Sequence, residues 1–242
     1  MNMKKISWLF VFFLFSCKTD WSYSGKGSPQ NWADISEKNK FCKIGFNQSP
    51  IDIKSTMNND FILNDLRFDY KSAEIEKVKA KHYQKINFYG KNFAFRGKKK
   101  YWLKYIEFHH PSEHLLDSNP HSLEMQIYHK SEDEQWLAVS YFLEISNQNN
   151  DNENLYFKNL INFLKSNQIE DKFDLSKIID KKSLSFFYEG SFTTPPCTEG
   201  VKWYIMKNPI YISKEQMSAI IKSTIFVKSN RRGVQKFNSE KF

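Results

Sequence analysis

The sequence predicts a single domain built mainly of β-strands, with a few short helices at its periphery. The chain has 242 residues, a length that suits one sizeable domain. Its 22 Phe and 12 Tyr favour strands and a large buried core. Many segments show strand patterning, and no internal repeat or Gly/Pro-rich linker divides the chain. We therefore expect one continuous β-rich fold.

Short strands are expected along most of the chain, wherever apolar residues alternate with polar ones or form short runs. The apolar run QWLAVSYFLE is the strongest of these and is typical of a central, buried strand. Besides the histidine-rich segment treated below, the predicted strands begin at Ile51 or cover residues 61–70, 73–80, 86–95, 135–144, 185–189 and 201–206.

Two segments show helical spacing instead. In residues 153–167, four apolar residues fall on one face of a helix, namely Phe157, Leu160, Ile161 and Leu164. Near the C-terminus, Ser213 and Gln216 have the spacing of a capping box and predict a second short helix. The two consecutive prolines of GSFTTPPCTEG predict a rigid loop, because proline fits neither a helix interior nor a central strand.

The first residues have the pattern of an export signal rather than of the fold. Lys4 and Lys5 precede an apolar segment, residues 6–15, that is too short to span a membrane. Residues 1–16 resemble a bacterial lipoprotein signal, which predicts a lipid on Cys17; an ordinary signal with an incidental cysteine is the alternative. We expect a tether and N-terminal arm over 17–30, the domain over 31–242, and a lipid-anchored location in the bacterial cell envelope, facing the periplasm or the surface.

The formal net charge of the whole chain is +9, and removing the two lysines of the signal leaves +7. A basic surface favours anionic partners such as an acidic glycan, although solvated lysines without any dedicated partner give the same composition. The basic turn RGKKK, residues 96–100, is interpreted in the same way, as a solvated hairpin tip. We expect no nucleic-acid partner.

Besides Cys17, the chain has two cysteines, Cys42 and Cys197. An isolated pair in an exported protein indicates a disulfide. Two buried free thiols are the alternative.

Five of the six histidines lie between Tyr105 and Lys130. Read as a strand, this segment places Glu107 and His109 on one face, because side chains two residues apart on a strand share a face. A second strand follows the PSEH turn and places Gln126 and Tyr128 together. If the two strands pair, Glu107, His109 and Gln126 converge and form either a metal site or the remainder of one.

The spaced motifs WSYSG, CKIGFNQSPIDI, EFHHPSEH, LEMQIYH and YEGSFTTPPCTEGVKW resemble the α-class carbonic anhydrases of bacterial type. The resemblance runs from about Trp21 to Gln235. It implies a central, mostly antiparallel, twisted β-sheet with a conical cleft and a Cys42–Cys197 disulfide. The implied activity is reversible hydration of CO2 to bicarbonate by a Zn²⁺ ion that three histidines hold and that activates a water molecule.

This chain departs from the family pattern at the metal. The three ligand positions correspond to Glu107, His109 and Gln126, so only one histidine remains. An amide oxygen is a poor zinc ligand beside imidazole, and a carboxylate disfavours ionisation of the bound water. His110 and His129 point to the opposite face of their strands from His109 and Gln126, so they are not expected to replace the lost ligands. We therefore expect zinc binding to be weak or absent.

Residues that support the reaction are better retained in the resemblance. Thr193 and Glu113 match the pair that orients the zinc-bound hydroxide, and Thr194 matches the threonine beside it. Glu124 matches the glutamate that braces the third ligand, and His114 matches a buried histidine that holds the fold together.

The pocket that would hold CO2 is altered. Trp203 and Val139 are expected to match its walls, whereas Tyr128 replaces a small aliphatic residue and Phe192 replaces a common leucine. The proton-shuttle position falls near Gln84, which cannot titrate near neutral pH. His82 is a shuttle candidate shifted in register, and a surface histidine is its alternative interpretation.

Three functional hypotheses follow. The first is a catalytically weak or silent binding module, whose ligand is an anionic glycan or a partner protein. The second is a carbonate dehydratase with an unorthodox metal site at Glu107, His109 and Gln126. The third is a structural or decaying paralogue without a specific ligand.

Overall fold

The structure is a computed structural model of the chain. It describes residues 20–56, 62–63, 65–79, 84–146, 154–166, 168, 170–180, 183–224 and 227–236. The predicted export signal, Cys17 and His82 lie outside the described residues.

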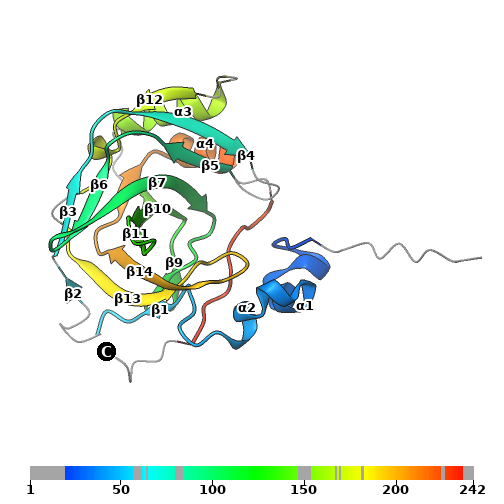
Figure 1. Cartoon of the computed structure of the whole chain (residues 1–242). Coiled ribbons are helices and arrows are strands. Elements are labelled where there is room, and N and C mark those ends of the chain that lie inside the picture. The colour runs from blue at the N-terminus through cyan, green and yellow to red at the C-terminus, as the bar shows by residue number, and fades with distance from the viewer. Residues whose placement is uncertain are drawn as a thin grey trace, which may run out of the picture.

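Most of the described strands join one large, twisted sheet (Figure 1). Its strands are β2 Ile62–Leu63, β3 Leu66–Asp69, β4 Ala73–Lys79, β5 Gln84–Phe88, β6 Phe93–Arg96, β7 Lys99–His109, β10 Leu123–Ser131, β11 Trp136–Ile145, β12 Glu170–Phe173, β13 Ser185–Ser191, β14 Glu199–Met206 and β15 Ile210–Ile212. Along the main path the order is β12-β4-β5-β7-β10-β11-β14-β13-β2. Only β14 and β15 run parallel to their neighbour β11 in this sheet, so the predicted mostly antiparallel sheet is confirmed.

A second, small sheet lies beside the first and joins β1 Asp52–Ile53, β8 Leu115–Leu116 and β9 Asn119–Pro120. It anchors the turn after β7, because β1 pairs in parallel with β8. This turn carries Glu113 and His114, so the small sheet helps to position two residues of the candidate site.

The strands β7, β10 and β11 form the centre of the large sheet. Almost every side chain of β10 is buried, so the polar residues that alternate with its apolar ones, Glu124 and Gln126, lie inside the molecule. One face packs on the main hydrophobic core, and the other face packs on a smaller cluster around Tyr128 and Trp203. The two faces differ in role, because the polar residues of the candidate site share the face of the smaller cluster.

The main core is covered by two helices, α3 Leu155–Lys165 and α4 Lys214–Thr224 (Figure 1). The four apolar residues at helical spacing in α3 are all buried in this core, as their spacing predicts. At the start of α4 the backbone N–H of Gln216 donates to Ser213 Oγ, and the Ser213 N–H donates to Gln216 Oε1. The predicted capping box is therefore confirmed.

An N-terminal arm of short helical turns lies outside the sheet and extends past residue 30, the end expected for it. Its turns are Gly25–Gly27, Pro29–Asn31, α1 Trp32–Ile35, Glu37–Asn39 and α2 Phe41–Ile44. The buried indole of Trp32 packs against the rings of Trp21 and Tyr23. A disulfide joins Cys42 of α2 to Cys197, as predicted, and ties the arm to the loop after β13. The C-terminal segment 227–236 then runs between this arm and the sheet (Figure 1). Within the described residues, every helix is too short or too polar to cross a membrane.

Candidate functional site: a sealed cleft at the centre of the sheet

The pairing of β7 with β10 brings the three ligand-position residues together. Gln126 lies opposite Glu107, and Glu124 lies opposite His109. Alternation along each strand then points Glu107, His109 and Gln126 to the same side of the sheet. All three side chains are buried, with exposed fractions of 3% or less.

His109 lies between two carboxylates. Its Nδ1–H donates to the backbone carbonyl of Asn230 at 2.8 Å, and its Nε2 lies 3.6 Å from Glu107 Oε1. Glu113 Oε1 is 3.5 Å from Nδ1. Burial by itself would lower the pKa of His109, but Glu113 and Glu107 outweigh it and raise this pKa to about 10. The two carboxylates thus favour a proton on this imidazole.

Glu107 is held ionised by its neighbours. Burial would raise its pKa, but the ammonium of Lys85, 3.9 Å from Oε2, and the ring of His109 hold the pKa below its ordinary value. Lys85 also lies over the ring of Tyr105, with 4.0 Å between the ammonium and the ring centre. The carboxylate therefore lies in an internal ion-pair arrangement with Lys85 and His109.

Gln126 has partners on both ends of its amide. Its Nε2 donates to Glu113 Oε2 at 3.0 Å and to Glu124 Oε1 at 2.9 Å. Its Oε1 accepts the hydroxyl hydrogen of Tyr128 at 2.7 Å. Burial raises the pKa of Tyr128 well above its usual range, so this hydroxyl remains a donor. Gln126 lies at a position where the family has a metal ligand, and both ends of its amide are thus engaged by other protein groups.

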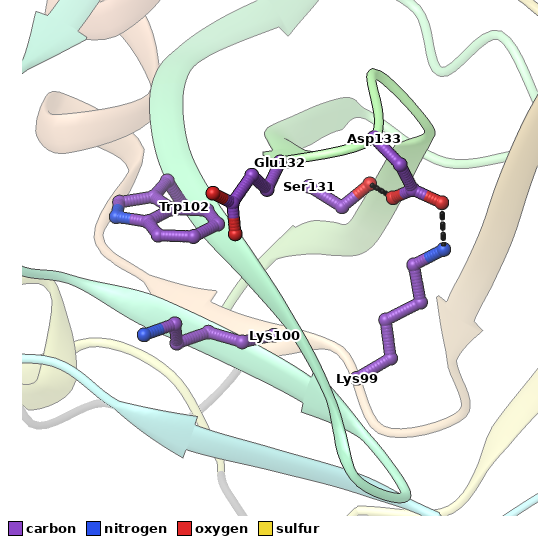
Figure 2. Close-up of a pocket in the computed structure, with 6 residues that line it drawn as sticks. All are labelled: Lys99, Lys100, Trp102, Ser131, Glu132 and Asp133. Carbon is purple, nitrogen blue, oxygen red and sulfur yellow. Dashed lines mark hydrogen bonds and ion pairs between the residues drawn. The ribbon is translucent and has the colours of Figure 1, made fainter.

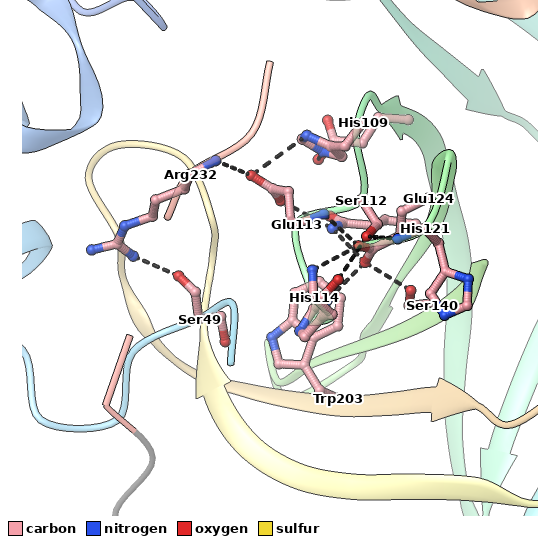
Figure 3. Close-up of polar contacts among 12 residues, drawn as sticks. Ser49, His109, Ser112, Glu113, His114, His121, Glu124, Ser140, Trp203 and Arg232 are labelled. Atoms are coloured by element: carbon pink, nitrogen blue, oxygen red, sulfur yellow. Dashed lines mark hydrogen bonds and ion pairs between the residues drawn. The ribbon is translucent and has the colours of Figure 1, made fainter. Parts of the chain in front are cut away.

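Glu124 is the hub of the polar contacts in Figure 3. Its Oε2 accepts the backbone N–H groups of Glu113 and His114, at 2.8 and 2.9 Å. Its Oε1 accepts from His114 Nδ1 at 2.7 Å and from Ser140 Oγ at 2.7 Å, in addition to Gln126. Burial opposes ionisation of Glu124, but these partners outweigh it and bring its pKa far below the ordinary value. The contact to Gln126 is the bracing contact that the resemblance implies for this residue.

His114 is fixed from both ring nitrogens and does not face the ligand positions as a free group. Its Nε2 lies 2.6 Å from the Tyr188 hydroxyl, which in turn donates to Ser49 Oγ at 2.7 Å. Tyr188 opens the motif YEGSFTTPPCTEGVKW and Ser49 lies in QSPIDI, so both belong to motifs that carry the resemblance. Neither residue was expected at this site, because they come from β13 and from the segment before β1.

Two residues of the C-terminal segment were also missed. Asn230 accepts from His109 through its backbone carbonyl, and its amide nitrogen donates to the Phe108 carbonyl at 2.8 Å. The backbone N–H of Arg232 donates to Glu113 Oε1 at 2.9 Å, and its buried guanidinium donates to the Ser49 carbonyl at 2.7 Å (Figure 3). No local sequence signal marks either residue, because both partners are more than 100 positions away.

Thr193 lies at the same site, on the loop after β13, and is fully buried. Its hydroxyl lies close enough to Glu113 and Tyr128 to influence both groups. Among the residues that the structure describes, it has no hydrogen-bond partner of good geometry, and neither does His109 Nε2. Thr194 is half-buried, and its carbonyl accepts the N–H of Cys197 at 2.9 Å.

The apolar side of the site is filled by stacked rings. The Tyr128 ring stacks on Tyr105 at 4.7 Å between ring centres and on Phe192 at 5.6 Å, and Trp203 meets it edge-on at 5.7 Å. Tyr128 itself is 1% exposed. Its side chain therefore closes the space in which the resemblance places a substrate.

The expectation for Val139 is wrong. Val139 packs in the main core on the other face of the sheet, and its neighbour Ala138 lies beside Tyr128 and Trp203. The register shows the reason, because Ala138 is directly opposite Tyr128 on β10 and Trp203 on β14. The small Ala138 thus makes room for the large Tyr128.

The remaining histidines and the shuttle position lie apart from this centre. His110 contacts the Ser122 carbonyl through Nδ1, and the buried His129 faces Tyr70 on the main-core side. His121 pairs with Glu144. Gln84 is buried, and its Nε2 has no hydrogen-bond partner in the described part of the chain.

The residues present do not fit a three-histidine zinc centre. One imidazole is available, and two carboxylates favour its protonated form. The amide oxygen of Gln126 already accepts from Tyr128. Across the described ranges, no three His, Cys, Asp or Glu side chains are arranged so that they could hold a metal ion.

Comparisons with known proteins agree with the fold. The family model of eukaryotic-type carbonic anhydrase matches residues 27–241. A carbonic anhydrase from Neisseria gonorrhoeae is 29% identical over 91% of this chain and 86% of its own length. The solved α-carbonic anhydrase of Thermovibrio ammonificans is similar with a TM-score of 0.79 and 29% identity, over 91% of this chain and 96% of that one. Dioscorin, solved in complex with ascorbate, is similar with a TM-score of 0.76 and 26% identity, over 90% and 94%.

The family model covers most of the chain, and the register of β7 and β10 places the family's ligand positions at one buried centre. The chain therefore belongs to the eukaryotic-type carbonic anhydrase family.

Proposed function

We propose that this chain is a catalytically silent member of its family that acts as a binding protein, lipid-anchored through Cys17 in the bacterial cell envelope. One observation carries the proposal. The Tyr128 hydroxyl donates to Gln126 Oε1, which lies at a ligand position, and the Tyr128 ring fills the adjoining apolar space.

The charges at the centre support the same conclusion. Metal-assisted hydration requires neutral imidazoles and a metal charge that ionises a bound water. Here the imidazole of His109 shares its surroundings with the carboxylates of Glu107 and Glu113, which favour a proton on it. That proton and the ammonium of Lys85 lie close enough to offset the charges of Glu107 and Glu113.

The ligand that we propose is an acidic polysaccharide. The chain without its signal has a net charge of +7, and a lipid anchor would display the domain where polysaccharides are found. The fold of a structural neighbour, dioscorin, holds the organic ligand ascorbate. With the cleft sealed by Tyr128, the binding surface of this chain lies outside it.

A second candidate function is favoured by a separate observation. His109 Nε2 and Thr193 Oγ1 are buried polar atoms without hydrogen-bond partners in the described structure. Buried polar atoms normally have a partner, and a metal ion or a water molecule would supply one. The second candidate is therefore a carbonate dehydratase with an unorthodox site at Glu107, His109 and Gln126.

Metal analysis and CO2 hydration kinetics on the purified full chain separate the two candidates. We expect no stoichiometric metal at saturating zinc and hydration at the uncatalysed rate. Hydration above that rate that disappears in His109→Ala would overturn the proposal and support the second candidate.

Restoring the ligands tests what closes the cleft. The double variant Glu107→His/Gln126→His should gain little zinc, because Tyr128 still fills the centre. Adding Tyr128→Val should allow stoichiometric zinc binding, read by metal analysis. Full zinc binding in the double variant alone would show that Tyr128 does not close the site.

A further inference from the structure

Four residues form a row across four neighbouring strands outside the sealed cleft. Phe93 of β6 lies opposite Trp102 of β7, Trp102 lies opposite Lys130 of β10, and Lys130 lies opposite Trp136 of β11. Directly opposite residues on adjacent strands share a face of the sheet. The row, Phe93–Trp102–Lys130–Trp136, therefore presents three rings and an ammonium side by side over roughly 14 Å, three strand spacings.

All four side chains of this row are partly exposed. The ammonium of Lys100 adds to the row, because it lies 4.8 Å from the ring centres of both Phe93 and Trp102. Lys130 lies 5.3 Å from the ring centre of Trp136. Rings and cations thus alternate along a surface that water reaches.

The row is continuous with the rings that seal the cleft. Trp136 contacts Phe192 at 5.1 Å and Tyr105 at 6.3 Å between ring centres. Tyr105 and Phe192 in turn stack on Tyr128. The aromatic surface therefore extends from the sealed cleft outward onto the row.

A cavity of about 470 Å³ opens beside Trp102 of the row. Figure 2 shows the Trp102 ring, the Lys100 ammonium and the Glu132 carboxylate on one side of it, and the Lys99–Asp133 pair on the other. Within the described part of the chain, the side chains of Lys100 and Glu132 form no ion pair or hydrogen bond. The cavity thus offers a ring, one available cation and one available carboxylate.

We propose that the Phe93–Trp102–Lys130–Trp136 row and this cavity bind an acidic polysaccharide, a placement that rests on the proposed binding function. Indole rings pack against the apolar faces of sugar rings. The Lys100 ammonium meets a carboxylate or sulfate of the polysaccharide, and Glu132 accepts hydrogen bonds from sugar hydroxyls.

The charges around the row favour a sugar chain over a nucleic acid. Asp133 pairs with Lys99, and Glu134 pairs with Lys130, so two of the three lysines at the row are already balanced. A nucleic acid carries a phosphate at every residue and requires a continuous positive track. Acidic side chains beside a ring suit a ligand with many hydroxyls and few charges.

The test measures binding of deacylated gellan, an acidic polysaccharide with a carboxylate on only some of its sugars, to the purified full chain, with neutral dextran and single-stranded DNA as comparison ligands. We expect Lys100→Glu and Trp102→Ala each to weaken gellan binding by about tenfold or more. The matched control is Lys222→Glu on α4, an exposed position with the same charge change away from the row. Thermal unfolding checks that Trp102→Ala remains folded, and Lys100→Glu changes an exposed side chain only.

Three results would overturn this placement. They are an absence of gellan binding, a loss in Lys222→Glu equal to that in Lys100→Glu, and equal affinity for single-stranded DNA. None of them bears on the proposed loss of catalysis, which fails only through metal binding and CO2 hydration.

Discussion

Replacing Tyr128 with phenylalanine removes one hydroxyl from the sealed cleft and leaves the ring in place. That hydroxyl is 2.7 Å from Gln126 Oε1, and both residues are at most 1% exposed. When the hydroxyl is removed, the buried Gln126 amide oxygen loses this donor, and the free energy of unfolding should fall by about 1–3 kcal/mol. For a domain of this size each kcal/mol lowers the melting temperature by roughly 2–4 °C.

Guanidinium chloride unfolding measures this cost. The matched control is Tyr211→Phe, since Tyr211 is 59% exposed and its hydroxyl faces solvent, so its effect should lie within about 0.5 kcal/mol. In the Gln126→Leu variant the acceptor is absent. Adding Tyr128→Phe to it should therefore reduce the free energy of unfolding by at least about 0.5 kcal/mol less than Tyr128→Phe does in the wild type. The reasoning is refuted if Tyr128→Phe is as harmless as the control, or if the two substitutions are strictly additive.

Three further predictions concern packing, the disulfide and pH. Ala138→Leu should destabilise the fold by about 1–3 kcal/mol, because the added atoms meet the Tyr128 ring, and Tyr128→Val should recover part of this loss in thermal melts. Reducing the Cys42–Cys197 disulfide, which closes a loop of 155 residues, should lower the free energy of unfolding by up to about 5 kcal/mol, read with and without reductant. Burial holds the pKa of His129 at about 3, below its unfolded value, so the folded protein keeps this ring neutral. The contribution of His129 to the free energy of unfolding is complete above about pH 6.5. It decreases as the pH falls from there toward about 3, by at most about 1.4 kcal/mol per pH unit.

Each of these has an outcome that contradicts it. An Ala138→Leu protein that melts like the wild type would show that the ring does not fill the space above this alanine. Unchanged unfolding after verified reduction would mean that the loop closure contributes nothing. For pH, His129→Gln should flatten the acid side of the stability profile; a profile that keeps its slope would assign the acid sensitivity to other groups.

The alternation of side chains was sufficient to predict which residues meet at the centre. Because a strand repeats every two residues, Glu107 and His109 had to share a face, and His110 had to point elsewhere. The pairing register of β7 and β10 agrees with this inference and brings Gln126 to the same place. The disulfide could be predicted for a comparable reason, since a chain expected to be exported, with one cysteine pair besides Cys17, has one way to form it.

The same reasoning failed for Val139. In β11 almost every side chain is buried, and the single small polar residue among its buried ones, Ser140, is a weak signal of which face each neighbour takes. The alternation was present, but its phase could be read only from the residues opposite, Tyr128 and Trp203. For a strand buried on both faces, the sequence leaves the assignment of faces open.

The sequence by itself determined that this family member has one of three histidine ligands and a glutamate and a glutamine at the other two positions. It also determined that a tyrosine lies two residues after Gln126, on the same face. Only the tertiary structure decided that the Tyr128 hydroxyl completes the Gln126 amide, and that Asn230 and Arg232 hold His109 and Glu113. The physical reason is that a hydroxyl position depends on how its ring packs, and the packing partners come from strands and segments far apart along the chain.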